Sequence, residues 1–294
     1  MLNLLTIDVE EWFHTTALEP YVDIDQWDSL GSRVVPNVRR VLEILAKHQT
    51  RATFFILGWV AERHPKLVQE IAAQGHEIAS HGYRHRLIYK LSPETFKDYV
   101  RKSKDILENL IGQPVLGYRA TSFSIIHSTL WALDIIREAG FVYDSSIFPI
   151  KHDIYGMAGF PRFPCKLENG LMEIPPSTIR IPGKNIPIAG GGYFRLFPYW
   201  VTRKGIQCIN RAGHPALVYL HPWELDTDCP RITKTDWRTR FRQYVNLDKA
   251  SGRLERLLSN FHFMPIKEYL NKEEIPMKDA HERNRRYGRD TNLV

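Results

Sequence analysis

The sequence predicts an α/β fold built on a parallel sheet, and three observations favour this class. Predicted strands alternate with predicted helices at a spacing of about 25–30 residues, as in successive βα units. Residues with reactive side chains stand at the carboxyl ends of several predicted strands, where barrel enzymes build their active sites. The length of 294 residues is normal for a barrel. No glycine-rich turn follows the first strand, so an open, doubly wound dinucleotide-binding sheet is the less favoured alternative.

The first half of the chain carries the regular part of this pattern. A strand over Leu2–Val9 runs into an acidic pair, and a helix is expected from about Pro36, because proline suits the first helical turn. A second helix is expected from about Pro65, and a long helix capped by Ser92 is expected to end near Gly112. The other elements expected here are the strands Ala52–Leu57, Glu77–Ser80, Val115–Arg119 and Phe141–Asp144 and the helix Ser128–Ala139.

Prolines and glycines interrupt this pattern between residues 147 and 195. They favour loops and short β pieces over helices, so the stretch is interpreted as an insertion that shapes a substrate cleft. The run Gly190-Gly191-Gly192 lacks the spacing of a phosphate loop, and a flexible loop is expected there. The pattern resumes with a helix over 198–212, a strand over 216–220 and a helix over 247–261.

Composition and charge place the chain among ordinary globular proteins. Hydrophobic residues make up 43% and charged residues 25%, which allows a sizeable core and excludes wholesale disorder. The net charge of +7 is diffuse and shows no interleaved aromatic stripe, which argues against a nucleic-acid partner. Only the tail after Asn271 is locally basic, and a solvated, flexible tail is favoured over a contact with an anionic or membrane surface.

The cysteines and the N-terminal segment predict a reduced, cytoplasmic setting. The three cysteines, Cys165, Cys208 and Cys229, have neither zinc-knuckle nor redox spacing. Met1–Leu5 has no basic region and leads directly into the acidic pair, so it is expected to be a core strand and not a signal peptide. No segment approaches the roughly 18 apolar residues that a bilayer span needs. The inner face of the inner membrane remains a second expected location.

Two histidines and two acids form the first candidate site. His81 and His85 are four residues apart, so two imidazoles lie on one side of a turn and can share a metal. Asp8 and Glu10 alternate at a strand end and point to one face, which is costly without a cation or a basic partner. The alternatives are ordinary surface histidines and salt-bridged strand-end acids.

Three further residues stand at strand ends. Arg119 could hold a carboxylate in a fixed orientation, or it could be a surface arginine. Asp144 could orient a catalytic histidine or cap a helix, and His221 could be catalytic or a satisfied core histidine. Glu11 points to the face opposite the acidic pair and is a poorer candidate, and His14 is expected at the edge of the cleft.

In this order the motifs resemble those of the carbohydrate esterase family 4 polysaccharide deacetylases, the NodB-homology family. Thr6–Glu10 is similar to the first motif of that family, and His81–His85 to its metal-binding histidine motif. Gly117–Arg119 is similar to the arginine motif, and Leu220-His221 to the final histidine motif. The resemblance covers about residues 3–225. It implies a distorted (β/α)7 barrel.

A closer resemblance is to the subgroup found in exopolysaccharide loci of Gram-negative bacteria with the exosortase/PEP-CTERM system. Asp8–His14, Gly190–Arg195, His221–Glu224 and Phe241–Tyr244 carry it. The implied division is a deacetylase barrel at 1–225 with an insertion at about 147–195, a C-terminal extension at 226–270 packed on the barrel, and a basic tail at 271–294.

The chain departs from the family pattern at three positions. Val9 stands where many members have a second aspartate, so the metal carboxylate must be Glu10. Thr121 replaces the usual proline after the arginine motif, and Asp144 is not in the commonest form of its motif.

The resemblance implies a metal-dependent hydrolase that cleaves linear amides and removes N-acetyl groups from amino sugars of a bacterial exopolysaccharide. Glu10, His81 and His85 would hold a divalent cation, with Zn²⁺ favoured over Co²⁺, Ni²⁺ or Mn²⁺. The other implied roles are Asp8 as general base, Arg119 as the group that aims it, His221 as general acid and Asp144 as its orienting partner. Candidates for stacking on sugar rings are Tyr193, Phe194, Trp223 and Trp12, although each could equally be a core residue.

Two other functions stay open. An amidohydrolase that acts on a small cyclic amide or a formamide would share the barrel and the use of a bound metal. It would need a closed pocket instead of an open groove. A catalytically inactive carbohydrate-binding homologue would have no need of Asp8, Arg119 and His221. The expected partners are a glycan with N-acetylated amino sugars and, peripherally, a polysaccharide synthesis complex.

Overall fold

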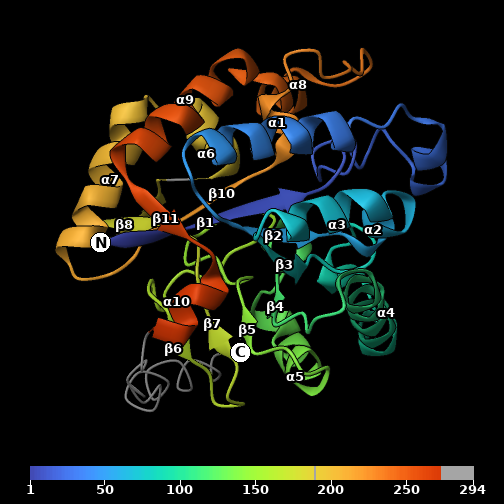
Figure 1. The fold of residues 1–294 in the computed structure, drawn as a ribbon, viewed down its shortest axis with the longest axis horizontal. Helices are drawn as coiled ribbons and strands as arrows, with labels where there is room; N and C mark the ends of the chain where they lie inside the picture. The colour runs from blue at the N-terminus through green and yellow to red at the C-terminus, as the bar shows by residue number, and fades with distance from the viewer. Residues whose placement is uncertain (189, 273–294) are drawn as a thin grey trace, which may run out of the picture.

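Seven parallel strands form the centre of the computed structural model, which describes residues 1–188 and 190–272 (Figure 1). Their spatial order is β10 (Leu217–Leu220), β1 (Leu2–Val9), β2 (Thr53–Ile56), β3 (Glu77–Ser80), β4 (Gly117–Tyr118), β5 (Tyr143–Asp144) and β7 (Met172–Glu173). The short strand β6 (Cys165–Lys166) adds an antiparallel edge to β7. Strand β11 (His262–Met264) pairs in parallel with the first residues of β1.

The sheet curls until its two ends meet. Ser177, just beyond β7, donates its backbone N–H to the carbonyl of Leu217 in β10 at 3.3 Å. Its hydroxyl accepts the N–H of Leu217 at 2.7 Å. No helix lies between β5 and β7, so the barrel is irregular on that side. The expected distorted (β/α)7 barrel is confirmed.

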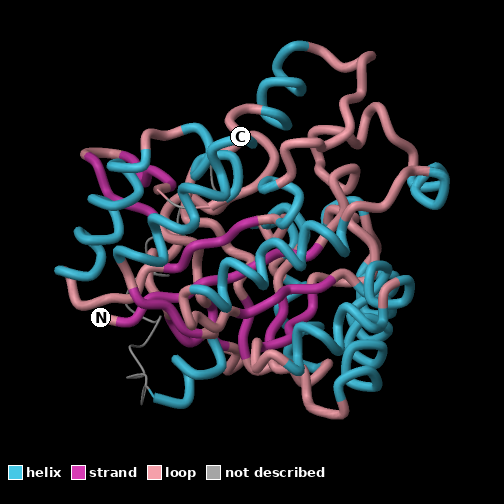
Figure 2. Tube along the Cα trace, turned by 45° about the horizontal axis from the view of Figure 1, so that its top comes forward, coloured by secondary structure: helices cyan, strands magenta, loops and turns pink. Residues whose placement is uncertain are grey.

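Helices surround the strands (Figure 2). Capping geometry confirms both ends predicted for the long helix α4: Ser92 accepts the N–H of Thr95, and Gly112 has a left-handed φ of 65°. The helices between the strands of the barrel are α1 (Val34–Lys47), α2 (Gly58–Arg63), α3 (Pro65–Ala73), α4 (Pro93–Ile111), α5 (Trp131–Glu138) and α7 (Tyr199–Arg211). None of the described helices is both long enough and apolar enough to cross a bilayer.

The glycine run is not the flexible loop that the sequence predicts. After the hairpin of β8 (Thr178–Ile181) and β9 (Lys184–Pro187), the chain forms the helix α6 (Gly191–Leu196). Gly190 precedes this helix with a φ of 117°, and a Cβ there would lie 2.1 Å from the ring of Tyr219. The glycine therefore permits close contact with β10, and the expectation that residues 147–195 hold no helix is wrong.

The last described elements return to the barrel. They are α8 (Trp237–Tyr244), α9 (Leu247–Asn260), β11 and α10 (Ile266–Lys272). The N–H of Ile266 donates to the hydroxyl of Thr53 in β2 at 2.8 Å. Beyond Lys272, the expected basic tail lies outside the described residues.

Glu11 fixes the start of α1, since its buried carboxylate accepts the N–H groups of Arg33 at 3.0 Å and of Val34 at 3.3 Å. The hydroxyl of Ser32 also donates to it. The carboxylate thus satisfies donors that a helix leaves free at its N-terminus. The residue that follows the acidic pair therefore anchors α1 beside β1.

Replacing Glu11 by alanine should lower the free energy of unfolding by about 1–3 kcal/mol, because buried N–H donors lose their acceptor. Urea denaturation followed by circular dichroism measures this change. Glu43→Ala, on the exposed face of the same helix, is the matched control and should change stability by less than about 0.5 kcal/mol. Equal effects of the two substitutions would contradict the anchoring role.

Candidate active site

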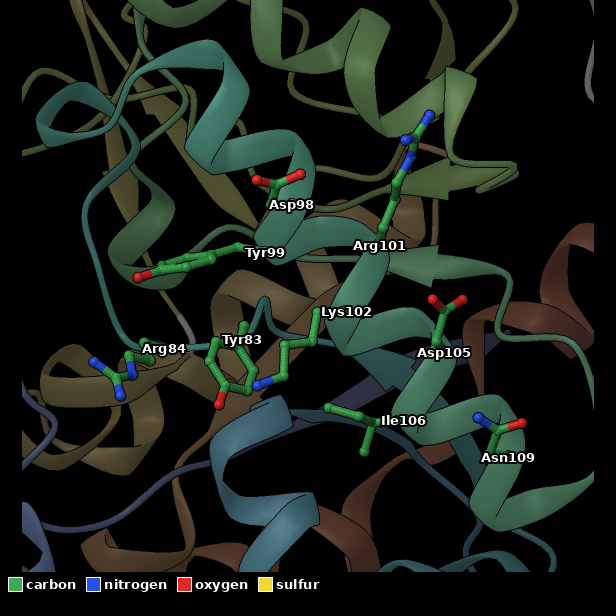
Figure 3. A pocket seen from close by; sticks show the side chains of 9 residues that line it. All are labelled: Tyr83, Arg84, Asp98, Tyr99, Arg101, Lys102, Asp105, Ile106 and Asn109. Atoms are coloured by element: carbon green, nitrogen blue, oxygen red, sulfur yellow. The ribbon is translucent and has the colours of Figure 1, made fainter.

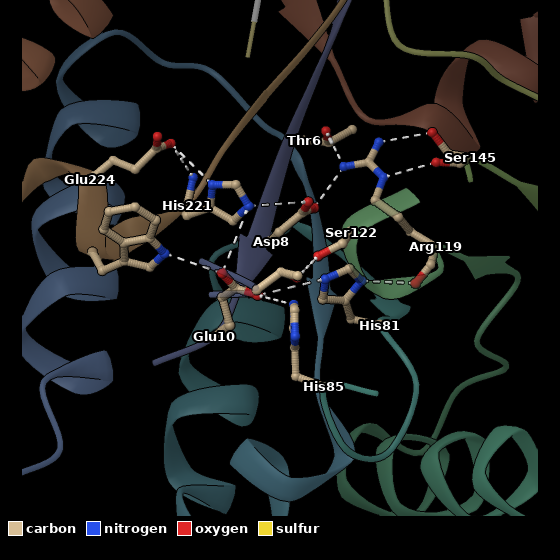
Figure 4. A network of polar contacts seen from close by, with 12 residues as sticks. Thr6, Asp8, Glu10, His81, His85, Arg119, Ser122, Ser145, His221 and Glu224 are labelled. Carbon is tan, nitrogen blue, oxygen red and sulfur yellow. Dashed lines mark hydrogen bonds and ion pairs between the residues drawn. The ribbon is translucent and has the colours of Figure 1, made fainter. Parts of the chain in front are cut away.

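The predicted catalytic residues gather at the carboxyl rim of the barrel (Figure 4). Parallel strands bring their carboxyl ends to the same side, so residues far apart in sequence become neighbours. Asp8 is in β1 and Glu10 follows it, His81 and His85 follow β3, Arg119 follows β4, and His221 follows β10. The structure therefore brings six of the seven predicted catalytic and metal residues together.

Glu10, His81 and His85 form a cluster with the chemistry of a metal site. Their ligand atoms all lie within 4.8 Å of one another. Glu10 Oε2 is 3.0 Å from His85 Nε2 and 3.9 Å from His81 Nε2. This oxygen is buried and makes no hydrogen bond with acceptable geometry. A buried carboxylate oxygen without a hydrogen bond is costly unless a cation compensates it, so these residues fit a divalent metal.

The protonation of His81 also suits a ligand. Its Nδ1 donates to the carbonyl of Arg119 at 2.8 Å, which leaves the Nε2 lone pair directed toward Glu10. Burial lowers the pKa of His81 to about 4, so the imidazole is neutral at pH 7. Burial raises the pKa of Glu10, but the nearby His85 and His221 outweigh it and hold that pKa well below its ordinary value.

A buried arginine fixes the position of Asp8. The side chain of Arg119 is fully buried and donates to Asp8 Oδ1 at 2.6 Å and to the hydroxyl of Thr6 at 2.8 Å. Its other nitrogens donate to the carbonyl and hydroxyl of Ser145 at 3.1 and 2.8 Å. The ring of Phe55 lies 4.1 Å from the guanidinium carbon. These contacts engage Oδ1 of Asp8 and leave Oδ2 facing His221.

A buried ion pair, Arg195–Glu224, holds His221 on the side of its Nδ1. Its Nδ1 lies 3.1 Å from Glu224 Oε2, and its backbone N–H donates to the same oxygen at 2.9 Å. Arg195 donates to Glu224 Oε1 at 2.7 Å, and both partners of this ion pair are buried. On the opposite side of the ring, Nε2 lies 3.9 Å from Asp8 Oδ2 and 3.8 Å from Glu10 Oε1. The imidazole therefore bridges the ion pair and the rim.

The electrostatics of His221 and Glu224 agree with this arrangement. Burial lowers the pKa of His221, but Glu10 and Glu224 outweigh it and raise the value to about 9. Burial raises the pKa of Glu224, but Arg195 and His221 hold it below its usual range. The side chain of His221 is 19% exposed, so the site opens to solvent at this residue.

Asp144 does not contact His221, and the expectation that it orients this histidine is wrong. Its carboxylate accepts the hydroxyl and the N–H of Ser146 at 2.6 and 3.1 Å. Burial raises its pKa. Glu224 takes the expected place. Glu224 could have been predicted as this partner, because it is an acid three residues after His221. The role of Arg195 could not, because nothing in the glycine-rich segment around it indicates a contact with Glu224.

The aromatic candidates are mostly structural. Trp12 and Phe194 are buried in the core, and the indole of Trp12 donates to the carbonyl of Gly31, so neither forms a stacking surface. Trp223 is also buried, but its indole donates to Glu10 Oε1 at 3.2 Å. Tyr193 is partly exposed and contacts the core. Trp223 therefore positions the Glu10 carboxylate instead of offering a platform.

His14 is not at the edge of the cleft as expected. It is buried between the rings of Trp27 at 4.1 Å and Trp59 at 5.1 Å. Its ring also lies nearly parallel to that of His85, at 6.2 Å. His14 therefore packs beside the ring of His85.

The segment between His81 and His85 is held from outside the barrel. The carbonyls of Gly82 and Tyr83 accept the N–H groups of Gly58 and Trp59 at 2.8 Å each. Beside α4, a surface depression of about 660 Å³ contains Tyr83, with the ammonium of Lys102 3.7 Å from its ring centre (Figure 3). These contacts fix the backbone on which the two histidines are spaced.

Comparisons with known proteins divide the chain in two. Residues 25–143 match the family model described as polysaccharide deacetylase, and residues 145–271 match a domain of unknown function, DUF3473. His81, His85 and Arg119 fall in the first match, whereas Arg195, His221 and Glu224 fall in the second. Both stretches therefore contribute to the rim.

Curated relatives match shorter stretches of the chain. The chain is 33% identical to a peptidoglycan-N-acetylglucosamine deacetylase of Bacillus cereus over 96 residues, which are 32% of this chain and 35% of the relative. In three such alignments the chain spans 24–37% of the length of the curated relative.

Two solved structures share the fold. A candidate polysaccharide deacetylase from Mycobacterium smegmatis has a TM-score of 0.61 at 20% identity, covering 92% of this chain and 88% of that one. An allantoinase has a TM-score of 0.59 at 15% identity, covering 91% and 88%.

The cluster should bind one Zn²⁺ or Co²⁺ per chain, measured by isothermal titration and by the visible spectrum of Co²⁺. His85→Ala should weaken binding by more than the roughly 10–100-fold typical of losing an outer-shell partner, because it removes a ligand. His127→Ala, at an exposed position, should bind like the parent protein. Undiminished affinity in His85→Ala would exclude the cluster as the metal site.

Proposed function

We propose that the chain is a polysaccharide deacetylase that hydrolyses N-acetyl groups on amino sugars of a bacterial exopolysaccharide in a metal-dependent reaction, as the family match over residues 25–143 supports. The observation that carries this proposal is the convergence at one rim of a buried carboxylate–arginine pair, a carboxylate–histidine cluster and a histidine backed by a carboxylate. These are the groups that amide hydrolysis requires: a base, a polarising centre and an acid.

Glu10, His81 and His85 would hold the divalent cation, and one carboxylate with two imidazoles is a ligand set that suits Zn²⁺. When bound, the cation would polarise the acetamide carbonyl and acidify a water molecule. Hydrogen bonds from Arg119 to Asp8 and from Trp223 to Glu10 orient the two acids.

Asp8 would act as the general base. Arg119 engages its Oδ1, which leaves Oδ2 on the side of His221 to accept a proton from water. The water oxygen forms a bond to the amide carbon as Asp8 takes that proton. Because the arginine is buried and fixed by four hydrogen bonds, the carboxylate is held in one orientation before substrate arrives.

His221 would act as the general acid. Its Nδ1 is engaged by Glu224, so its Nε2 is the nitrogen that faces the rim and can donate a proton. The amide C–N bond breaks as the nitrogen receives this proton, and acetate and a free amino sugar result. Glu224 is a positioning residue in this scheme, because it acts on substrate only through the imidazole.

The stretch that matches the domain of unknown function would supply this acid and its support. Arg195 donates to Glu224 and, through its other nitrogens, to the carbonyls of Arg242, Gln243 and Val245. The C-terminal end of α8 is thereby tied to the histidine. This chain of buried charged groups, which ends at an imidazole on the rim, favours catalysis over a binding protein without activity.

Asp8→Asn should retain the metal and lower turnover of an N-acetylated chitooligosaccharide by roughly 100-fold or more, because the variant has no base. Acetate release measures turnover, and metal content is measured in parallel. Asp98→Asn, an exposed position on α4, should behave like the parent protein. Turnover near the parent rate would reject the role of Asp8. Faster hydrolysis of a cyclic amide such as allantoin than of any N-acetylated glycan would instead favour the small-amide alternative.

Glu224→Gln should slow release of an amine leaving group by roughly 10-fold or more, with little change in KM, because the acid loses its orienting carboxylate. A leaving group that needs no proton should be insensitive, so turnover of p-nitrophenyl acetate should stay within about twofold. Glu43→Gln is the control. Equal losses on amide and aryl ester would show that the substitution disturbs the whole site and would refute a specific role in proton donation.

A further inference from the structure

Helix α8 exposes large aromatic side chains at the surface. Trp237 is 72% exposed and Phe241 is 50% exposed. They are four residues apart, so they share one face of the helix. Tyr21 lies beside them, because its hydroxyl donates to Asp236 at the start of the helix. Exposed aromatics in such a group indicate a contact surface.

The same region concentrates positive charge. Residues 231–242 hold one acidic residue, Asp236, whose carboxylate already accepts from Tyr21 and caps α8. Among the described residues, no carboxylate forms an ion pair with any basic side chain of this 231–242 segment. The exposed basic residues are Arg231, Lys234, Arg238, Arg240 and Arg242.

This arrangement corrects the expectation of diffuse charge without interleaved aromatics. By contrast, Lys97, Lys102 and Lys104 on α4 each pair with a glutamate. Here Trp237 and Phe241 alternate with arginines along a single helix. We define the α8 face as Tyr21, Trp237, Phe241 and the five basic residues.

The α8 face turns outward beside the catalytic rim. On the inner side of the helix, the amide of Gln243 donates to the carbonyl of Trp12 and accepts from the hydroxyl of Thr15. Both partners lie in the segment that follows Glu10. Figure 1 shows α8 at the periphery of the molecule, above the end of β1. The aromatic and basic side chains are thus presented on an outer edge and not inside a groove.

We propose that the α8 face binds the surface of an anionic lipid membrane. Trp, Tyr and Phe suit the boundary between headgroups and acyl chains, and surrounding arginines and lysine suit acidic headgroups. Pairing of two copies through this face is disfavoured, because a two-fold contact would oppose ten unpaired positive charges. A projecting edge also fits a broad lipid surface better than a single glycan strand, which is bound more readily in a groove.

The test is cosedimentation of the full chain with vesicles of phosphatidylcholine alone or with about one third phosphatidylglycerol. The chain should bind the anionic vesicles, and binding should fall as salt is raised, because the charges at the surface are screened. Lys234→Glu with Arg238→Glu should weaken partitioning by at least about tenfold, since each basic residue near the surface contributes severalfold. Trp237→Ala with Phe241→Ala should weaken it comparably.

Matched controls distinguish the effect of the α8 face from the effects of net charge and of exposed apolar side chains elsewhere. Lys66→Glu with Arg101→Glu changes charge equally on other helices, and Trp200→Ala with Ile181→Ala removes exposed apolar side chains elsewhere. Both pairs should bind like the parent chain. The α8 variants should keep the far-ultraviolet circular dichroism of the parent, which shows that they fold. Because binding is read without turnover, the result is independent of the proposed deacetylase activity.

Three results would overturn the proposal. The first is equal binding to neutral and anionic vesicles, or none to either. The second is vesicle binding that neither α8 variant weakens. The third is binding of soluble polygalacturonate that the α8 variants abolish while vesicles do not bind, which would assign the face to an acidic glycan.

Discussion

The site depends on one buried guanidinium. Arg119 joins β1, through Thr6 and Asp8, to the segment after β5, through Ser145. Its own carbonyl holds the imidazole of His81. Burying an arginine is costly unless its donors find partners, and here four hydrogen bonds draw those partners from distant parts of the chain. The positions of Asp8 and of the Glu10–His81–His85 cluster are therefore set together, by one residue that contacts both Asp8 and His81.

Much of the fold could be predicted from sequence because its signals are local. Ser92 and Gly112 bound α4 through capping and a left-handed turn, and Pro65 begins α3 as expected. The pattern gave no indication of the short helix α2. It misjudged the glycine run, because the need for Gly190 arises from the ring of Tyr219, which is close only in three dimensions. Contacts between residues far apart in the sequence leave no periodic pattern in it, so they cannot be predicted from the sequence alone.

The candidate site could likewise be predicted from the sequence only in part. Residues with a strand-end position and a reactive side chain, such as Asp8 and His221, could be identified one by one. The partner of His221 is harder to predict: the spacing of three to Glu224 is a usable signal, but Asp144 is also an acid near a strand end, and the folded chain shows which one reaches the imidazole. The sequence does not separate the aromatics either: Trp12, Phe194 and Trp223 are all buried, and the hydrogen bond from the indole of Trp223 to Glu10 is what links Trp223 to the site.

Strand order has a consequence for dissecting this chain into modules. β10 comes late in the sequence yet pairs along β1, the first strand, and β11 covers the beginning of the same strand. A cut between residues 143 and 145, where the two family matches meet, would leave the N-terminal fragment with an unpaired hydrophobic edge and without His221. The other fragment would keep His221 but lose its neighbouring strand. Grafting either half onto a homologue would thus require redesigning the β1–β10 seam along with the loops.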